Sequence, residues 1–294
     1  MKPLVVIVGP TASGKSELAV HIAQKFGCEI ISADSWQVRR GLNIGTSKAS
    51  PHTQALVPHH LIDVVAAGGY YSAAEYKKGA LKAIEDIYKR GKLPLLVGGT
   101  GLYIDSVLFD YSFLPPADRK TRSKLNSMSL EQLTLLANHR NLAMDSIDRR
   151  NKRRLIRLIE TEGGVATKGP PREDSLVIGL RPDGDELYAA INARVENMVR
   201  QGLEAEVKRL ATKYGWESEA LKGIGYSEWQ LYLDGQQSLD TTKQRIIKNS
   251  LKLARRQVTW FRRNKSIHWF LTPVDLDKVD ELITTFLSKY SPHV

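Results

Sequence analysis

Short apolar runs alternate with segments of helical periodicity in the first part of the chain. The apolar runs predict strands at Leu4–Val8, Glu29–Ala33 and Leu93–Val97. Apolar residues three and four apart predict helices at Lys15–Lys25 and Ser72–Lys89. This alternation of strands and helices is typical of a parallel sheet, which binds ligands where its strands end.

The pattern changes at Pro115, where a polar stretch with helical periodicity and no convincing strand begins. Leu176–Leu180 is again a short apolar run and is predicted to return to the sheet as a strand. Helical periodicity then extends over Glu186–Lys213, with a possible break at Gly202. The middle of the chain therefore reads as a helical insertion within a strand-and-helix core.

The most specific motif lies between the first strand and the first helix, where the chain reads G-x-x-x-x-G-K-S. Its glycines let backbone N–H groups point at phosphate oxygens, and the helix N-terminus adds a positive dipole end. Lys15 supplies a positive charge and Ser16 a hydroxyl for Mg²⁺. The predicted diphosphate site is Gly9, Pro10, Thr11, Ala12, Ser13, Gly14, Lys15 and Ser16. The motif identifies a phosphate group and leaves open what carries it.

Together these patterns predict an α/β fold with a P-loop NTPase-like parallel sheet. We expect residues 1–114 and 175–294 to form this catalytic core, which ends in a helical C-terminal part. Residues 115–174 are expected to form the small all-helical insertion.

The composition of the 294 residues, with 42% hydrophobic and 26% charged, is that of a globular protein. No apolar run approaches the ~20 residues of a membrane span, and the start of the chain lacks a signal-peptide pattern. The lone Cys28 excludes an internal disulfide. The cytoplasm is the expected location, and no membrane contact is expected.

The formal net charge of +11 favours a polyanionic partner, and the distribution of the charge strengthens this expectation. No acidic residue occurs between Asp240 and Asp275, while basic residues gather on one face of a predicted helix that includes Arg255 and Arg256. A second basic cluster lies in the insertion and includes Arg153, Arg154 and Arg157. Two such clusters on one chain favour contact with a nucleic-acid backbone.

Two further residues follow predicted strands and therefore lie at the expected ligand-binding edge. Asp34 closes the second strand, where it can act as a metal ligand, a general base or a helix N-cap. Thr100 follows Gly98 and Gly99 after the third strand, where glycines allow close approach of a ligand. The lack of an acidic residue directly after this third strand argues against a motor ATPase.

These motifs, in this order, resemble the tRNA dimethylallyltransferase (tRNA isopentenyltransferase) family. The similarity covers nearly the whole chain and includes the P-loop, Ile30–Ser35 with Gln37-Val38, Gly41, Ile44–Thr46, Pro58–Asp63, Tyr71–Ala74, Leu96–Tyr103, Leu114-Pro115 with Ala117-Asp118, Arg122, Arg154 with Arg157, Met198, Gly202-Leu203, Glu206-Val207, Ile224–Tyr226 and Ala254–Arg262. No Cys/His zinc-finger extension of the eukaryotic kind is present, so the bacterial type is expected.

The resemblance implies transfer of a dimethylallyl group from its diphosphate to the exocyclic amine of the adenosine 3′-adjacent to the anticodon of tRNA. Asp34 would be the general base, Thr100 would orient the amine or a phosphate oxygen, and Lys15 would stabilise the leaving diphosphate. Arg194 would add a diphosphate contact, and Ser16 would bind the Mg²⁺ cofactor. The tRNA anticodon stem-loop would contact Asp34, Ser35, Trp36, Gln37, Thr100, Arg122, Arg153, Arg154, Arg157, Arg255 and Arg256. A monomer is expected, and whether ATP also occupies the P-loop stays open.

Two positions depart from the family pattern, which has an aromatic residue at Arg39 and a basic residue at Ser227. These departures bear on tRNA contact rather than on the chemistry. Three alternatives stay open. A prenyltransferase acting on free adenine nucleotides would keep the P-loop and Asp34 without needing the basic clusters. A small-molecule P-loop kinase would need only the phosphate site, and a non-catalytic RNA-binding protein only the basic residues.

Overall fold

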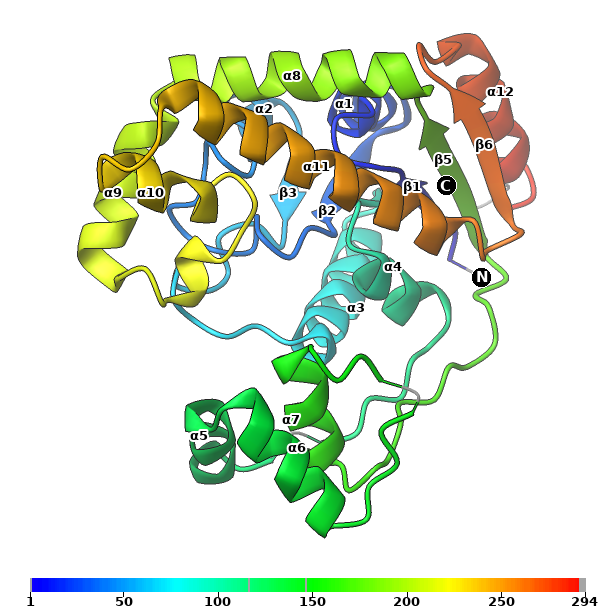
Figure 1. Ribbon diagram of the computed structural model, residues 1–294. Helices are drawn as coiled ribbons and strands as arrows, with labels where there is room; N and C mark the ends of the chain where they lie inside the picture. The colour runs from blue at the N-terminus through cyan, green and yellow to red at the C-terminus, as the bar shows by residue number, and fades with distance from the viewer. Residues whose placement is uncertain (1, 116, 146, 291–294) are drawn as a thin grey trace. The chain divides into compact units, whose positions relative to one another are not determined.

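A computed structural model describes residues 2–115, 117–145 and 147–290 of the chain (Figure 1). Its backbone contacts divide the chain into two compact units. Unit 1 comprises residues 1–108 and 172–294 and contains the sheet, whereas unit 2 comprises residues 109–171. The sequence placed the insertion at 115–174. The compact unit starts earlier because Ser112 pairs with Thr167, which ties its two ends together.

The described part of unit 1 contains one six-stranded parallel sheet with the strand order β3-β2-β4-β1-β5-β6. The strands are β1 (Leu4–Val8), β2 (Cys28–Ser32), β3 (His59–His60), β4 (Leu93–Gly98), β5 (Ser175–Arg181) and β6 (Ile267–Leu271). The predicted α/β class with a parallel sheet is thereby confirmed.

Strand β1 lies at the centre of this sheet, between β4 and β5. Ile7 is in register with Val97 on one side and with Ile178 on the other. All five β1 side chains are buried, because both faces of the sheet are covered. This double burial explains why the strand reads as an uninterrupted apolar run in the sequence.

Helices flank the sheet and extend beyond it. They are α1 (Lys15–Phe26), α2 (Pro51–Leu56), α3 (Ala73–Lys89), α4 (Gly101–Leu108), α5 (Arg119–Ser127), α6 (Leu130–His139), α7 (Lys152–Glu160), α8 (Gly184–Arg200), α9 (Leu203–Tyr214), α10 (Gln230–Leu233), α11 (Leu239–Phe261) and α12 (Leu276–Leu287), with short 3₁₀ turns η1 (Glu219–Leu221) and η2 (Ser227–Trp229). The long helices α8 and α11 run side by side in unit 1 (Figure 1). The predicted break at Gly202 is confirmed, since this residue has a φ of 94° between α8 and α9.

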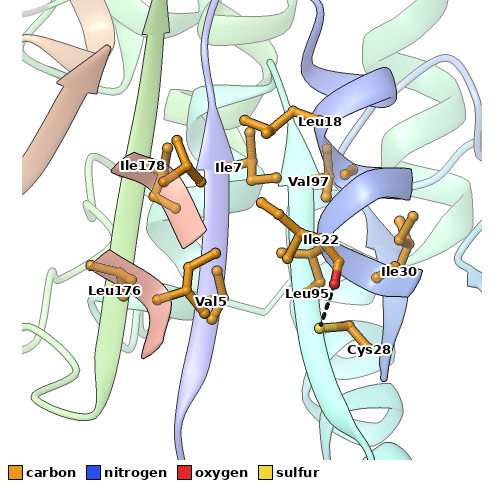
Figure 2. Close-up of a cluster of buried hydrophobic side chains, with 14 of the residues drawn as sticks. Val5, Ile7, Leu18, Ile22, Cys28, Ile30, Leu95, Val97, Leu176 and Ile178 are labelled. Carbon is orange, nitrogen blue, oxygen red and sulfur yellow. Dashed lines mark hydrogen bonds between the residues drawn. The ribbon is translucent and has the colours of Figure 1, made fainter. Parts of the chain in front are cut away.

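One face of the sheet packs against α1. Leu18 and Ile22 of this helix meet Val5 and Ile7 of β1 in a buried cluster (Figure 2). Residues of α12 contribute to the same cluster, so α12 shares this face with α1. The cluster fixes the direction of α1, and therefore the place of the P-loop that precedes it.

The carboxyl ends of β2 and β4 are held together at the edge of the sheet where the candidate residues lie. The Ala33 N–H donates to the Val97 carbonyl at 2.7 Å, and the Thr100 N–H donates to the Ala33 carbonyl at 3.1 Å. Only glycine fits at position 98, because a Cβ there would lie 2.2 Å from the Ala33 oxygen. This close approach brings the residues after β2 against the turn after β4.

Unit 2 has a small core of its own, built from α5, α6 and α7. Its buried side chains include Leu125, Leu133, Leu155 and Ile159. A completely buried carboxylate, Glu160, pairs in this unit with two predicted tRNA-binding residues, as described below. The insertion is thus a packed helical unit, as the periodicity predicts.

Within the ranges that the structure describes, no helix is both long and apolar enough to cross a membrane.

Candidate active site

A cleft of about 920 Å³ lies in unit 1, and most of the residues of this unit that are predicted to bind the diphosphate line it. Its lining includes the P-loop from Thr11 to Ser16, together with Asp34, Trp36, Gln37 and Arg194. Among the elements that line it are the P-loop, the turns after β2 and β4, and the helices α1, α8 and α11. The elements come together because the parallel strands end at the same edge of the sheet.

The P-loop has the backbone shape that an anion cradle requires. Ala12 and Gly14 have positive φ values of 60° and 80°, which turn successive N–H groups toward one side. Lys15 begins α1, and its ammonium donates to the Pro10 carbonyl and lies 3.4 Å from the Ser13 hydroxyl. Ser16 is exposed in the first turn of this helix.

Two cations share this end of the cleft. Burial and then the positive charge of Arg194 lower the pKa of Lys15 to about 7, against the opposing influence of Asp34. Burial also lowers the pKa of Arg194 itself, again opposed by the Asp34 carboxylate. Crowding two buried cations beside one carboxylate leaves an excess of positive charge, which an anionic ligand would neutralise.

Arg194 projects from α8 onto the P-loop, where its Nη1 donates to the Thr11 hydroxyl. In the described part of the chain its Nε is buried and has no hydrogen-bond partner. A buried guanidinium donor without a partner is costly, so its presence at the cleft indicates a site for an acceptor such as a phosphate oxygen.

Asp34 is half-buried on the cleft wall, directly after β2. Its Oδ1 accepts hydrogen bonds from the N–H groups of Trp36, at 2.7 Å, and Gln37, at 3.3 Å. The helix N-cap expected as one alternative is wrong, because residues 35–38 form a turn and the next helix is α2. The two hydrogen bonds use Oδ1, so they fix the carboxyl group in one orientation while it lines the cleft.

Thr100 lies beside this turn rather than on the cleft wall. Its Oγ1 accepts from the Ser35 N–H at 3.1 Å and lies 3.4 Å from the Ser35 hydroxyl. The structure therefore joins Thr100 to the residue after Asp34. The adjacent Gly98 and Gly99 line the cleft directly.

Two residues that hold the cleft walls, Glu206 and Gln257, are not among those predicted from the sequence. The buried carboxylate of Glu206 on α9 accepts from the N–H groups of residues 43, 44 and 45 at 3.0–3.2 Å and from the Tyr226 hydroxyl at 2.8 Å. The side-chain amide of Gln257 on α11 contacts the P-loop and the turn after β4. Ile246, Ser250, Leu253 and Gln257 lie at helical spacing and all line the cleft, but this row mixes apolar and polar residues, so the sequence alone does not single out Gln257.

The predicted basic residues fall into both units. Arg255 and Arg256 are exposed on α11 of unit 1, and Arg256 also lines the cleft. Arg153 and Arg154 are exposed on α7 of unit 2. Their exposure leaves these side chains accessible to a polyanion in solution.

Two other predicted basic residues of unit 2 have a structural partner. The Arg122 Nε lies 2.7 Å from one oxygen of Glu160, and the Arg157 Nη1 lies 3.5 Å from the other. Arg157 also donates to the carbonyls of Leu114 and Pro115, at 2.6 Å and 3.2 Å. Both side chains are thus held in place within unit 2.

Comparison with known proteins agrees with this geometry. The family model described as IPP transferase matches residues 37–264. The chain is 39% identical to the tRNA dimethylallyltransferase of Bacillus subtilis (strain 168), over 98% of both proteins. The chain belongs to the tRNA dimethylallyltransferase family. The predicted family and the prediction of a prenyltransferase enzyme are confirmed.

Solved structures of family members share the fold. The tRNA isopentenylpyrophosphate transferase of Bacillus halodurans has a TM-score of 0.76 and 36% identity, with 98% of each chain covered. A eukaryotic dimethylallyltransferase acting on tRNA has a TM-score of 0.82 and 25% identity, covering 99% of this chain and 81% of the other. The same arrangement of sheet and helices is therefore found in tRNA dimethylallyltransferases beyond the bacterial ones.

Proposed function

We propose that the protein transfers a dimethylallyl group from dimethylallyl diphosphate to the exocyclic amine of the adenosine 3′-adjacent to the anticodon in tRNA. One observation carries this proposal: a P-loop with two crowded cations and an oriented carboxylate share a single cleft. The full-length similarity to tRNA dimethylallyltransferases supports the identity of both substrates.

The cationic end of the cleft suits the leaving group. As the amine nitrogen forms its bond to the allylic carbon, the carbon–oxygen bond breaks and its electron pair leaves with the diphosphate. Negative charge grows on that diphosphate, where the P-loop N–H groups, Lys15 and Arg194 can stabilise it. The unpartnered Arg194 Nε is one donor available for this purpose.

The carboxylate suits the nucleophile. The lone pair of an adenine amine is delocalised into the ring, so the amine attacks only if its proton can be accepted as the new bond forms. We assign this role to Asp34, because its hydrogen bonds within the turn after β2 hold a carboxyl group that lines the cleft. Thr100 supports it indirectly by binding the Ser35 N–H.

The residues present also fit a bound Mg²⁺. Among the described residues, no group of three or more His, Cys, Asp or Glu side chains could hold a metal ion. Mg²⁺ does not require such a group, because it commonly keeps several waters and binds substrate phosphates. The Ser16 hydroxyl would hold it next to the diphosphate, where the ion would neutralise charge on the leaving group.

The RNA contacts are supported by the exposed basic side chains. Arg255 and Arg256 on α11 and Arg153 and Arg154 on α7 would bind the backbone of the anticodon stem-loop. The target base must leave its stack to reach a carboxylate in a cleft. A tRNA substrate also supports the cytoplasm as the location.

A competition assay tests the function. The purified protein is given dimethylallyl diphosphate together with equal concentrations of an anticodon stem-loop RNA and AMP. We expect the RNA to be prenylated preferentially, because only RNA uses the basic side chains. Preferential prenylation of AMP would instead identify an enzyme of free nucleotides. In a parallel reaction with ATP in place of dimethylallyl diphosphate, a phosphorylated product would identify a kinase.

A further inference from the structure

Gln257 joins two parts of the cleft that are far apart in the sequence. Its Oε1 accepts from the Thr11 N–H in the P-loop at 2.8 Å, and its Nε2 donates to the Gly99 carbonyl at 3.0 Å. One primary amide thus satisfies a backbone donor and a backbone acceptor at once. An amide side chain offers both an acceptor and a donor in this planar arrangement at neutral pH, whereas an ionised carboxylate offers acceptors alone.

The helix that carries Gln257 is firmly seated on the same turn. One turn further along α11, the Trp260 ring covers Gly101, where a Cβ would lie 2.4 Å from it. The Trp260 Nε1 also donates to Asp105 in α4 at 3.1 Å. Because the helix is anchored here, Gln257 presents its amide to the P-loop from a fixed support.

Thr11 is the residue on which these contacts converge. Its N–H is bound by Gln257 from α11, and its hydroxyl is bound by Arg194 from α8. Two helices therefore hold the first half of the P-loop at Thr11. Displacing this segment would move the phosphate-binding N–H groups and the guanidinium that contacts it.

We propose that Gln257 is a positioning residue that fixes the P-loop relative to the turn after β4 and so sets the affinity for the diphosphate group. This inference deepens the proposed function and rests on it for the identity of the ligand. Gln257 acts through Thr11 and Gly99 and is not assigned a contact with either substrate. Its role differs from that of the neighbouring Arg255 and Arg256, which are proposed to bind RNA.

The decisive variant is Gln257→Glu. At neutral pH its carboxylate still accepts from the Thr11 N–H but repels the Gly99 carbonyl, so we expect inorganic diphosphate to bind about 10- to 100-fold more weakly. When protonated, the acid again offers one donor and one acceptor in the same plane. The ratio of wild-type to variant affinity should therefore shrink as the pH falls from about 8 to about 5, because burial raises the pKa of such a carboxyl above its usual value.

Two further variants keep the test independent of one substitution. Gln257→Met removes both polar contacts at similar size and should weaken diphosphate binding at every pH, without recovery in acid. Gly99→Ala places a Cβ 2.3 Å from the Gln257 Nε2 and should push the amide away. Gln257→Met and Gly99→Ala both break the hydrogen bond between Gln257 and the Gly99 carbonyl. In the double variant, their effects on diphosphate affinity should therefore be non-additive.

Gln244 provides the matched control, since it lies exposed on the same helix. Calorimetry with inorganic diphosphate and fluorescence binding of the stem-loop RNA are measured for each variant. We expect Gln244→Ala to change neither affinity, and Gln257→Glu to weaken diphosphate binding while RNA binding stays within about twofold of wild type.

Unchanged diphosphate affinity in Gln257→Glu and Gln257→Met would overturn the inference, as would a loss of RNA affinity alone. Diphosphate binding does not require prenyl transfer. A wild-type protein that binds diphosphate but prenylates no RNA would therefore refute the proposed function and leave the role of Gln257 intact.

Discussion

The substitution Asp34→Asn separates the catalytic role of this residue from its structural one. The asparagine side-chain oxygen can still accept the hydrogen bonds from the N–H groups of Trp36 and Gln37, so the turn after β2 should persist. The amide cannot accept a proton from the substrate amine. We therefore expect kcat to fall by about 10²- to 10⁴-fold, which corresponds to about 2.7–5.4 kcal/mol in the activation barrier.

Asp34→Ala is the matched comparison, because it removes both the base and the two hydrogen bonds within the turn. A hydrogen bond typically contributes about 0.5–1.5 kcal/mol net to stability, so the melting temperature of Asp34→Ala should drop by a few degrees while that of Asp34→Asn stays near wild type. Single-turnover prenylation of an anticodon stem-loop measures the rate, and calorimetry measures the melting temperature. A kcat for Asp34→Asn within about threefold of wild type would refute the base assignment. So would weakened RNA binding at a near-normal kcat, which would make Asp34 a contact residue.

Three further predictions concern other parts of unit 1. Replacing Arg255 and Arg256 by glutamine should flatten the dependence of log Kd for tRNA on log salt by about 0.7–0.9 for each phosphate that the protein no longer neutralises, measured by filter binding; an unchanged slope would place α11 away from the RNA. Burial raises the pKa of Cys28 to about 12, so Ellman's reagent should modify this thiol only after unfolding, and rapid modification of the native protein would contradict its burial. The hydrogen bond from Arg90 lowers the pKa of Glu29 from its ordinary value of 4.5. The ionised Glu29 carboxylate therefore stabilises the fold above pH 4.5, and this stabilisation is lost as the pH falls through the pKa of the folded protein. Thermal melts of Glu29→Gln and wild type should accordingly differ at pH 7 and converge in acid, and a difference that persisted in acid would exclude this ion pair as its cause.

The parts of the fold that can be predicted from the sequence are those determined by residues close together in the chain. β1 and β4 are buried on both faces, so each appears as a continuous apolar run, and the P-loop shape depends on Gly9 and Gly14, which lie within one short segment of the chain. β6 is an edge strand with only one fully buried residue, so its five residues carry no such run. β3 has only two residues and is defined by its pairing with β2. Such strands are fixed by tertiary contacts and could not be predicted from their own residues.

The same distinction applies to the candidate active site. The positions of Asp34 and Thr100 at the ligand-binding edge of the sheet could be predicted, because each lies two residues beyond the end of a strand, although Asp34 lines the cleft and Thr100 does not. Gln257 could not, because its partners lie 246 and 158 residues away in the chain. In the sequence it stands beside Arg255 and Arg256 and reads as part of a solvated helix face. Only the packing of α11 against the sheet edge brings it to the P-loop.

The central claim is that one cleft holds a diphosphate leaving group and a carboxylate that deprotonates the attacking amine. Its most direct test is a single-turnover reaction of the purified protein with dimethylallyl diphosphate, Mg²⁺ and an anticodon stem-loop, without ATP. Prenylated adenosine and released diphosphate are quantified together. We expect one diphosphate for each prenylated adenosine, with the dimethylallyl group on the exocyclic nitrogen. Diphosphate release without a prenylated base, or a strict requirement for ATP, would contradict the claim.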